Sequence, residues 1–306
     1  MRLNASELKQ KAGRLQIDGI GITPIKPVDA AVKDTFHAYL EQGRQAEMHY
    51  LERHLDKRFD PALLLPGAKS LVVILCAYAQ HGNTLRNPQV SLYAQGKDYH
   101  LYVKEKLFAL AEGLPEGSFR CFCDTAPILE KYWAEQAGLG VVGRNSLLLN
   151  PRFGSYCFIG ILLTQAEFDA YDRPLLQEED FTHPCKDCTR CEDACPAHAL
   201  QNGLNANKCI SYLTIEHKGE RPPLPASCWF GCDACQKACP VNHRIETPGH
   251  PEFQASEALL NLSRERIFSM SESEFQQAFA HSALLRAGLD GLKKNVLAGR
   301  NETIIH

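Results

Sequence analysis

Three short apolar runs divide the first half of the chain. They are Ser70–Ala79, Phe119–Cys123 and Tyr156–Thr164, and the first is rich in Val, Ile and Leu. Nearly continuous apolar runs of this length are typical of strands that are buried on both faces of a sheet. The pattern therefore predicts a buried β-sheet within residues 1–166.

Between these runs, apolar residues recur at helical spacing. The periodicity predicts helices over Val28–Leu40, Tyr99–Glu112 and Ile128–Ala137, and Pro127 stands where the third helix is expected to open. Because strands alternate with helices, we expect a layered α/β (α+β) domain over residues 1–166.

Three further units follow along the chain. Residues 167–180 carry six acidic residues against one basic residue, which predicts a solvated acidic linker. Residues 181–250 are rich in cysteine but too poor in apolar residues to form a core without metal. In residues 251–306, the helical patterns Glu274–His281 and Leu289–Ala298 contribute to an expected two or three helices that pack on the main domains.

The composition is that of a globular protein, since 44% of the 306 residues are hydrophobic and 23% are charged. No apolar stretch is long enough to span a membrane, and residues 1–15 predict an amphipathic helix rather than a signal sequence. We therefore expect a cytoplasmic location, where the thirteen cysteines favour metal ligation over disulfides. The net charge of −3 gives no general sign of nucleic-acid binding.

Four cysteines lie close together in the order Cys185-x2-Cys188-x2-Cys191-x3-Cys195, and a proline follows the last. This is the spacing of bacterial ferredoxins, in which the first three thiolates hold one 4Fe–4S cluster and the fourth crosses to a second cluster. A zinc site would instead use pairs of cysteines separated by longer gaps. The run therefore predicts iron–sulfur ligation.

A second, incomplete run repeats the last part of this pattern. It consists of Cys232-x2-Cys235-x3-Cys239 followed by a proline, and Trp229 occupies the position of the missing cysteine. Two clusters of this type need eight thiolates, and the two runs supply seven.

Cys209 and Cys228 are the candidates for the eighth ligand. Cys228 lies one residue from the expected position but precedes the bulky Trp229. Cys209 begins an apolar segment that can pack against the cluster loop. The sequence favours Cys209 without excluding Cys228. The ligand sets are then Cys185, Cys188, Cys191 and Cys239 for the first cluster, and Cys195, Cys209, Cys232 and Cys235 for the second. Four other cysteines fall on the predicted strands and are interpreted as small buried apolar residues: Cys76, Cys121, Cys123 and Cys157.

The segment Gly138-Leu-Gly140-Val-Val-Gly143 matches the glycine pattern of dinucleotide-binding sites. In such sites the pattern follows a strand and opens a helix, whereas here it follows the predicted helix Ile128–Ala137. We therefore reject a dinucleotide site and expect a helix C-terminus, whose glycines still allow a backbone to approach a flat ligand closely.

Asp124 is the best candidate for a catalytic acid. It follows the predicted strand Phe119–Cys123 and precedes a predicted helix, which is where α/β domains place ligand-binding residues. The position also suits a helix N-cap supplied by Asp124 or Thr125 ahead of Pro127, and position alone favours the cap.

Several segments, taken together, resemble the epoxyqueuosine reductase family. They are Asp124-Thr-Ala-Pro, the turn Ala137–Asn145, Gly154-Ser-Tyr, the run Cys185–Pro196, Cys209–Glu216 and Gly231–Gln236. The resemblance covers essentially the whole chain. It implies an enzyme that uses cobalamin and two 4Fe–4S clusters to reduce epoxyqueuosine to queuosine at the wobble position of tRNA, with a cobalamin domain resembling that of reductive dehalogenases and a ferredoxin-like domain.

The resemblance also implies roles for individual residues. Asp124 corresponds to the family's general acid, which favours catalysis over capping, and Cys209 corresponds to the eighth cluster ligand. The residues implied to contact cobalamin are Arg58, Tyr99, Asp124, Gly140, Gly143, Asn145, Ser211, Cys232 and Asp233.

The implied partners are tRNA carrying epoxyqueuosine and an external electron donor of the flavodoxin or ferredoxin type, with the enzyme acting as a monomer. Longer members of the family carry a C-terminal helical-repeat domain that binds tRNA, whereas this chain ends at His306. We therefore expect RNA binding by a small cationic patch, with Lys218, Lys293 and Lys294 as its main members and Arg221 and Arg300 beside them.

Two other functions stay open at this point. A reductive dehalogenase of a small organohalide would share the cofactors, but its typical members carry a twin-arginine signal that we do not find. An electron-transfer subunit of a larger reductase would need the clusters, but this function does not explain the large α/β domain. Bound cobalamin separates this subunit from the two enzymes, and nucleoside analysis of tRNA separates the enzymes.

Overall fold

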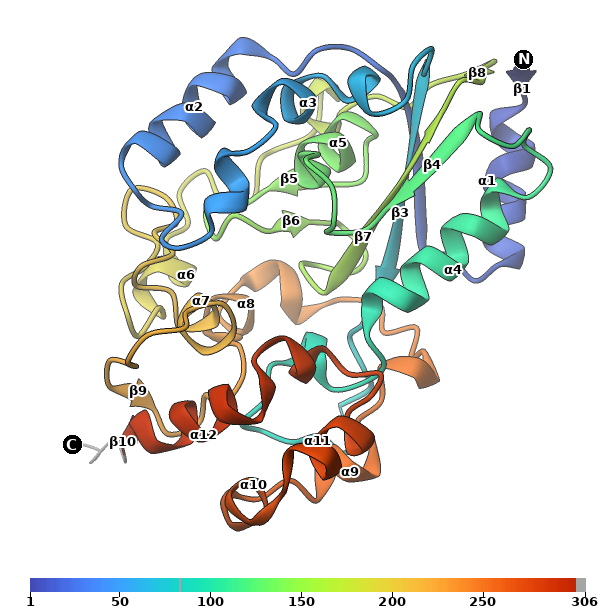
Figure 1. Ribbon diagram of the computed structural model, residues 1–306. Helices are drawn as coiled ribbons and strands as arrows, with labels where there is room; N and C mark the ends of the chain where they lie inside the picture. Colours follow the sequence, from blue (N-terminus) through green and yellow to red (C-terminus); the bar gives the residue numbers. More distant parts are fainter. Residues whose placement is uncertain (83, 301–306) are drawn as a thin grey trace.

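The computed structural model describes residues 1–82 and 84–300. Its first unit is built on a four-stranded sheet in the order β2–β3–β7–β4 (Figure 1). The strands are β1 (Arg2–Leu3), β2 (Gly19–Pro24), β3 (Ser70–Ala77), β4 (Phe119–Phe122), β5 (Val141–Val142), β6 (Leu148–Leu149), β7 (Cys157–Thr164), β8 (Glu167–Phe168), β9 (Leu224–Pro225) and β10 (Gly299–Arg300). The helices are α1 (Ala5–Arg14), α2 (Ala30–Glu41), α3 (Leu55–Phe59), α4 (Tyr99–Ala111), α5 (Glu130–Gln136), α6 (Arg190–Asp193), α7 (Ile210–Ile215), α8 (Ala234–Lys237), α9 (Glu257–Leu260), α10 (Arg264–Ser269), α11 (Glu272–Ala278) and α12 (Gly288–Ala298).

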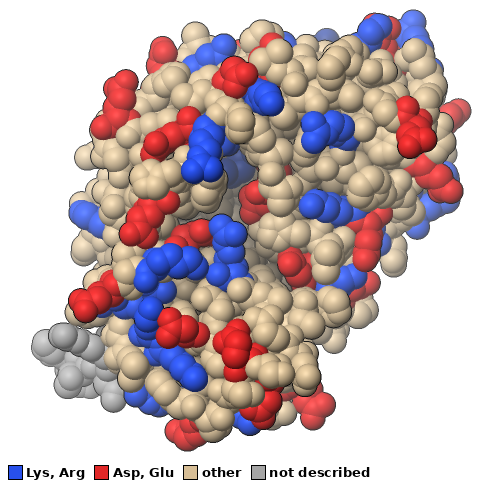
Figure 2. Space-filling view, in the orientation of Figure 1, with Lys and Arg blue, Asp and Glu red and all other residues tan. Residues whose placement is uncertain are grey.

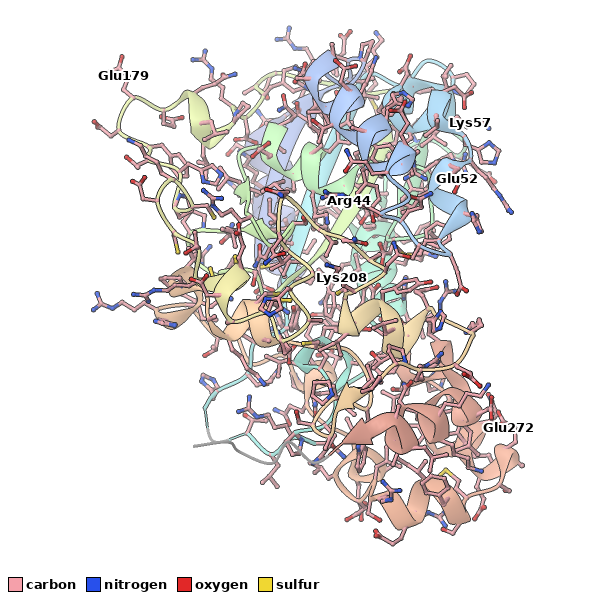
Figure 3. All side chains as sticks on the ribbon, turned by 90° about the vertical axis from the view of Figure 1, so that its left-hand side faces the viewer. Arg44, Glu52, Lys57, Glu179, Lys208 and Glu272 are labelled. Atoms are coloured by element: carbon pink, nitrogen blue, oxygen red, sulfur yellow. The ribbon has the colours of Figure 1, made fainter. Side chains whose placement is uncertain are left out.

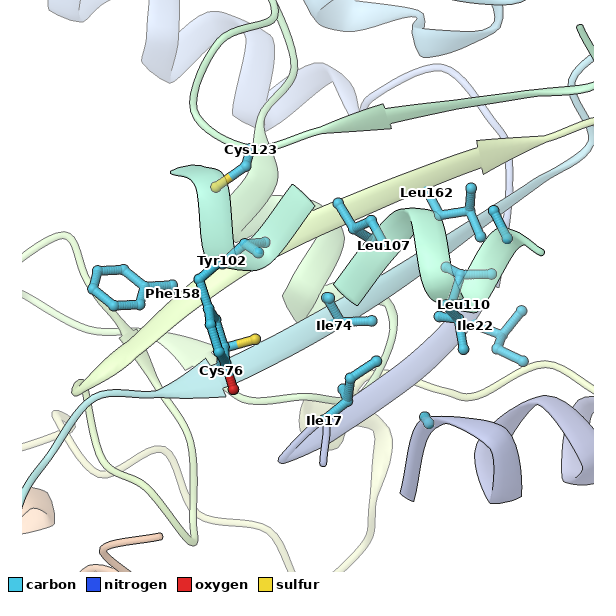
Figure 4. Close-up of a cluster of buried hydrophobic side chains, with 14 of the residues drawn as sticks. Ile17, Ile22, Ile74, Cys76, Tyr102, Leu107, Leu110, Cys123, Phe158 and Leu162 are labelled. Carbon is cyan, nitrogen blue, oxygen red and sulfur yellow. The ribbon is translucent and has the colours of Figure 1, made fainter. Parts of the chain in front are cut away.

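The main sheet is buried on both faces. All eight residues of β3 are buried, which explains the continuous apolar sequence of this strand. On one face α1 and α4 pack over strand side chains that include Ile22 and Ile74, and Leu107 of α4 belongs to this core (Figure 4). On the other face, residues of α2, α3 and α5 form a second core that includes Val73 and Trp133. The predicted layered α/β arrangement is therefore confirmed.

All neighbouring strands in this sheet run antiparallel. The rule that parallel sheets bind ligands at the carboxyl ends of their strands therefore does not account for the position of Asp124. The sequence analysis also missed β2, an edge strand in which Gly19 and Gly21 dilute the apolar pattern.

Helix α5 begins at Glu130, with Leu129 as the N-cap residue and no side-chain capping bond. The predictions that Pro127 opens this helix and that Asp124 or Thr125 caps it are therefore wrong. The other two predicted helices of this unit correspond to α2 and α4, within a few residues.

The first half of the predicted acidic linker packs on the first unit instead of lying free in solvent. Strand β8 pairs with β1, and the Asp172 carboxylate accepts hydrogen bonds from Lys9 Nζ at 2.6 Å and from the Ile22 backbone N–H at 2.8 Å. These contacts bring the two ends of the first unit together before the chain enters the cysteine-rich unit.

The C-terminal segment packs on the rest of the molecule, as the sequence predicts, but it does so as the four short helices α9–α12. Its apolar side chains, such as Phe275 and Leu292, surround Val90 and Ala94 of the first unit and Phe230 of the cysteine-rich unit. Among residues 1–82 and 84–300, none of the helices combines the length and the apolar character that crossing a membrane requires.

Candidate active site and cluster sites

Asp124 lies in a turn directly after β4 and adopts a left-handed backbone conformation, with φ of 58°. Its backbone N–H donates to Glu130 Oε1 at 2.7 Å, so the first residue of α5 fixes the turn. A non-glycine residue in this region costs about 1–2 kcal/mol. The bond to Glu130 stabilises this conformation, and the Asp124 side chain is left 61% exposed.

Tyr99, the first residue of α4, binds one oxygen of Asp124. Its hydroxyl donates to Asp124 Oδ2 at 2.5 Å, and its ring stacks on Phe158 with a centroid distance of 4.3 Å. Burial, followed by the charge of Asp124, raises the pKa of Tyr99, so the phenol stays a protonated donor. Tyr99 therefore engages Oδ2 of the Asp124 carboxylate.

His100 stands next to this pair and is oriented by Asp98. Its Nδ1 lies 2.8 Å from Asp98 Oδ1, and its Nε2 lies 4.0 Å from Asp124 Oδ2. The first turn of α4 and the turn after β4 therefore bring four polar side chains to one edge of the first unit.

A hollow opens between the first unit and the two units that follow it, and Lys and Arg side chains gather beside it (Figure 2). Burial raises the pKa of Tyr50, and the negative charges of Glu216 and Asp124 add to this effect, so the three groups lie near one another. Glu216 follows α7 and forms a two-point ion pair with Arg286, with both N–O distances at 2.9 Å. All three units therefore contribute polar groups to the surroundings of Asp124.

Two buried polar atoms close to this region have no hydrogen-bond partner within the described residues: Arg58 Nε and Gln45 Oε1. The Arg58 guanidinium is 6% exposed and donates from its NH2 group to the Tyr50 carbonyl at 3.3 Å. An unpaired donor and an unpaired acceptor fit a ligand that carries amide groups, as cobalamin does. Arg58 is one of the predicted cobalamin contacts, whereas Gln45 was not predicted.

Asp233, another predicted cobalamin contact, already forms hydrogen bonds within the protein. The Asp233 carboxylate is buried and accepts hydrogen bonds from the Ser91 hydroxyl and from the Leu92 backbone N–H, the latter at 2.9 Å. Ser91 and Leu92 belong to the first unit, so Asp233 joins two units. Ser211, at the start of α7, is half-buried.

Two of the three glycines in the turn after α5 serve the packing of the small β5–β6 hairpin. A Cβ atom on Gly140 would lie 2.5 Å from the Leu149 carbonyl oxygen, and one on Gly143 would lie 2.7 Å from Leu149 Cδ1. Gly138 has a φ of 72° and closes the C-terminus of α5, as the sequence predicts. The chain's own packing and backbone conformation therefore explain these glycines without a ligand.

The structure brings the four predicted ligands of the first cluster to one cavity. Cys185, Cys188, Cys191 and Cys239 line it together with Asn145, Leu149, Pro184, Pro240 and Val241. Helices α6 and α8, which carry parts of the two cysteine runs, lie in contact. Sequence positions more than forty residues apart therefore converge, as the exchange of the last cysteine between the runs requires.

The predicted ligands of the second cluster also lie close together. Burial raises the pKa of the Cys209 thiol, and the charges of Cys232 and Cys195 add to this increase. Cys235 is likewise buried and feels the charges of Cys232, Cys209 and Cys195. The Cys228 thiol also lies beside Cys232, which lowers the pKa of Cys228. Both candidates thus approach the site: Cys209 lies near Cys195, Cys232 and Cys235, and Cys228 lies near Cys232.

The cysteine-rich unit docks on the first unit through the segment after α2. Arg44 donates to the Asn202 carbonyl at 2.5 Å, and its own carbonyl accepts the Ala206 N–H at 2.8 Å. Figure 3 shows Arg44 and Lys208 at this junction. The four remaining cysteines fall on or directly after strands of the first unit, with Cys76 and Cys123 fully buried.

The predicted cationic patch is only partly available for RNA. Lys218 is exposed, whereas Lys294 pairs with Asp290 at 2.8 Å. Arg221 is half-buried and donates to Asn295 Oδ1 at 2.7 Å, so it supports the fold. Lys293 is half-buried on α12, and the Arg300 side chain lies outside the described residues.

Comparison with known proteins agrees with this architecture. The family "Epoxyqueuosine reductase QueG, DUF1730" matches residues 58–125, and the "4Fe-4S double cluster binding domain" matches residues 184–242. An epoxyqueuosine reductase of Leadbetterella byssophila is 37% identical over 307 residues, which cover 97% of this chain and 98% of that protein.

Two solved structures show the same fold. An epoxyqueuosine reductase with a tRNA-Tyr epoxyqueuosine-modified stem loop superposes with a TM-score of 0.85 at 29% identity, covering 96% of this chain and 80% of the other. The Bacillus subtilis enzyme, in a form with its catalytic aspartate loop swung out of the active site, gives a TM-score of 0.82 at 29% identity with the same coverage.

A mixed α/β unit joined to a double-cluster unit defines an iron–sulfur oxidoreductase. More specifically, the chain belongs to the epoxyqueuosine reductase family.

Proposed function

We propose that this enzyme reduces epoxyqueuosine to queuosine at the wobble position of tRNA, with Asp124 as the proton donor and with cobalamin and two 4Fe–4S clusters as cofactors. The observation that carries the proposal is the place of Asp124 at the edge of the first unit, where its charge and that of Glu216 from the double-cluster unit act on the same side chain, Tyr50. The solved relative that holds an epoxyqueuosine-modified stem loop supports the same substrate. It also disfavours a dehalogenase acting on a small organohalide.

The overall reaction consumes two electrons and two protons and releases the epoxide oxygen as water. Cobalamin, when bound, supplies a low-potential cobalt centre that delivers electrons to carbon. The two sets of four cysteines would hold the clusters that pass electrons to it from an external donor. Arg58 Nε and Gln45 Oε1 would meet amide groups of the corrin, because both atoms are buried without a partner among the described residues.

Asp124 has the geometry that proton donation requires. Tyr99 binds Oδ2 and Glu130 binds the backbone N–H, so Oδ1 is the oxygen that can carry a proton toward the substrate. An epoxide oxygen that leaves without a proton would depart as an alkoxide, which is costly, and general acids typically contribute about 10²–10⁴ in rate. The exposed Asp124 turn also fits a loop that moves, as the catalytic aspartate loop does in the Bacillus subtilis relative.

The RNA would approach across the basic rim of the hollow. Lys218, Lys293 and Lys294 are our candidates for phosphate contacts, and the rim would act mainly through charge. We further propose that the enzyme is cytoplasmic, since its substrate is tRNA. We also propose that it acts as a monomer and that a flavodoxin or ferredoxin supplies its electrons.

Anaerobic reconstitution tests this function. The purified enzyme should show iron–sulfur absorption and a further visible band on addition of cobalamin. With a chemical reductant and epoxyqueuosine-containing tRNA, nucleoside mass spectrometry should then detect queuosine. Cluster absorption without cobalamin binding would point to an electron-transfer protein. Cobalamin binding with organohalide turnover and no queuosine would point to a dehalogenase.

A further inference from the structure

Asn145 lies in the loop between β5 and β6, at the wall of the cavity that the first four cysteines share. We propose that its side-chain amide donates a hydrogen bond to the first 4Fe–4S cluster and thereby raises the reduction potential of that cluster. The proposal rests on the cluster ligation proposed above, but it does not depend on cobalamin or on tRNA. It moves Asn145 from the predicted cobalamin contacts to the first cluster.

The orientation of the Asn145 amide follows from its local contacts. Oδ1 accepts the Leu147 backbone N–H at 3.3 Å, which distinguishes the oxygen from the nitrogen. The side chain is 6% exposed, and Nδ2 is a buried donor with no hydrogen-bond partner within the described residues. Buried donors in native proteins are almost always paired, so Nδ2 points to an acceptor that the described part of the chain does not supply.

Among residues 1–82 and 84–300, the wall of this cavity offers no competing side-chain acceptor. Besides Asn145, its lining consists of the four cysteines and of Leu149, Pro184, Pro240 and Val241, whose side chains are apolar. The thiolates and the sulfides of a bound cluster are therefore the acceptors that the geometry leaves for Nδ2. Hydrogen bonds to these sulfurs are one of the recognised determinants of cluster potential.

The loop that carries Asn145 is fixed on one side to the cluster loop and on the other side to α5. Arg144 Nε donates to the Cys185 carbonyl at 3.1 Å, and Arg144 NH1 lies 3.4 Å from Glu192 Oε1. On the opposite side, Lys131 Nζ donates to the Ser146 carbonyl at 2.5 Å. These contacts position the amide beside the cysteines, which is what a tuning interaction requires.

The sign of the effect follows from charge. One-electron reduction adds negative charge to the cluster, so a neutral N–H donor stabilises the reduced form more than the oxidised form. The hydrogen bond therefore raises the potential and makes the first cluster easier to load from an external donor.

A redox titration of the cluster-loaded enzyme, followed by electron paramagnetic resonance, tests the proposal. Asn145→Leu removes the donor at similar volume, and Asn145→Asp keeps the acceptor for Leu147 but replaces the donor with a carboxylate. We expect Asn145→Leu to shift the reduction equilibrium of one cluster about tenfold toward the oxidised form, which is about 59 mV for one electron. Asn145→Asp should shift it further in the same direction. The other cluster should keep its potential.

Asn87→Leu is the matched control. Asn87 is also buried, but its amide donates to the Leu259 and Leu262 carbonyls in the C-terminal core. Its loss should lower stability and leave both potentials unchanged. Wild-type potentials in either Asn145 variant, at full iron content, would overturn the proposal.

A measurement on the wild-type enzyme covers the case in which both variants lose the cluster. Protein labelled with ¹⁵N in asparagine side-chain amides should show a ¹⁵N coupling to the reduced cluster in pulsed resonance spectra. A missing coupling would overturn the proposal. A wild-type protein without any 4Fe–4S signal would instead refute the cluster assignment itself.

Discussion

The Glu130 carboxylate accepts the backbone N–H of Asp124 at 2.7 Å, across the turn between β4 and α5. Glu130 is the first residue of α5, so the same side chain marks the start of the helix and fixes the left-handed residue before it. The position of the proposed acid is thus coupled to the position of a helix whose Trp133 is fully buried in the core. Glu130 is a positioning residue for Asp124.

The protonation of Glu130 should make stability depend on pH. Burial, followed by the charge of Asp124, raises the pKa of Glu130 from 4.5 to about 8. Between these values the folded state binds more protons than the unfolded state, so the free energy of unfolding falls as pH rises from about 4.5 to about 8. Glu130→Gln cannot titrate, so its melting temperature should vary less over this window than that of the wild type. Parallel profiles for the two proteins would contradict this account.

Replacing Glu130 should also separate positioning from folding. Glu130→Gln keeps an oxygen for the Asp124 N–H and should retain most activity. Glu130→Leu leaves this N–H without its partner, and we expect a decrease in kcat of about 10-fold or more, because a misplaced general acid loses part of its contribution of about 10²–10⁴. Cluster content and cobalamin binding should match the wild type in both variants. Equal kcat values for the Glu130→Gln and Glu130→Leu variants would show that the contact between Glu130 and the Asp124 N–H does not position Asp124.

The eighth cluster ligand can be identified by iron analysis. Wild-type enzyme should hold about eight iron atoms per chain, as two 4Fe–4S clusters require. Cys209→Ser should lose about half of the iron, because Cys209 interacts with Cys195, Cys232 and Cys235. Cys228→Ser serves as the matched control and should keep the wild-type content. The reverse result would make Cys228 the ligand.

RNA binding should depend on salt and on the proposed basic rim. Reversing Lys218, Lys293 and Lys294 to Glu should weaken tRNA binding and reduce the slope of log K against log salt by about 0.7 for each lost phosphate contact. Lys69→Glu is the control, because Lys69 precedes β3 at the end of the sheet opposite Asp124 and forms only a surface pair with Glu167. An unchanged salt slope in the triple variant would place the RNA contacts elsewhere.

Much of the fold could be predicted because its signals are local. Every residue of β3 is buried, so the apolar run of this strand is unbroken, whereas β2 is an edge strand diluted by two glycines. The start of α5 could not be predicted from Pro127, because the helix begins where Glu130 meets Asp124 in space. The antiparallel order of the sheet leaves no trace in the alternation of strands and helices.

The candidate site likewise has one part that the sequence predicts and another part that it does not. The spacing of the cysteine runs indicates the ligand sets, because one loop must surround one cluster. By contrast, the cavity position of Asn145 depends on contacts such as that between Arg144 and the Cys185 carbonyl, which are distant in sequence. The unpaired atoms of Gln45 and Arg58 likewise become visible only when burial and hydrogen bonding are known.

The central claim is that Asp124 donates the proton that lets the epoxide oxygen leave. Asp124→Asn can still accept the Tyr99 hydroxyl and donate its backbone N–H to Glu130, but it cannot supply the proton. Because Asp124 caps no helix, the variant should melt within a few degrees of the wild type and retain its iron and cobalamin.

The most direct test is the rate of queuosine formation in single-turnover reactions of wild-type and Asp124→Asn enzyme, both loaded with clusters and cobalamin and supplied with epoxyqueuosine-containing tRNA. We predict a rate at least about 100-fold lower for the variant, in line with the loss of a general acid. A wild-type rate in the Asn variant would contradict the account and assign the proton to another donor.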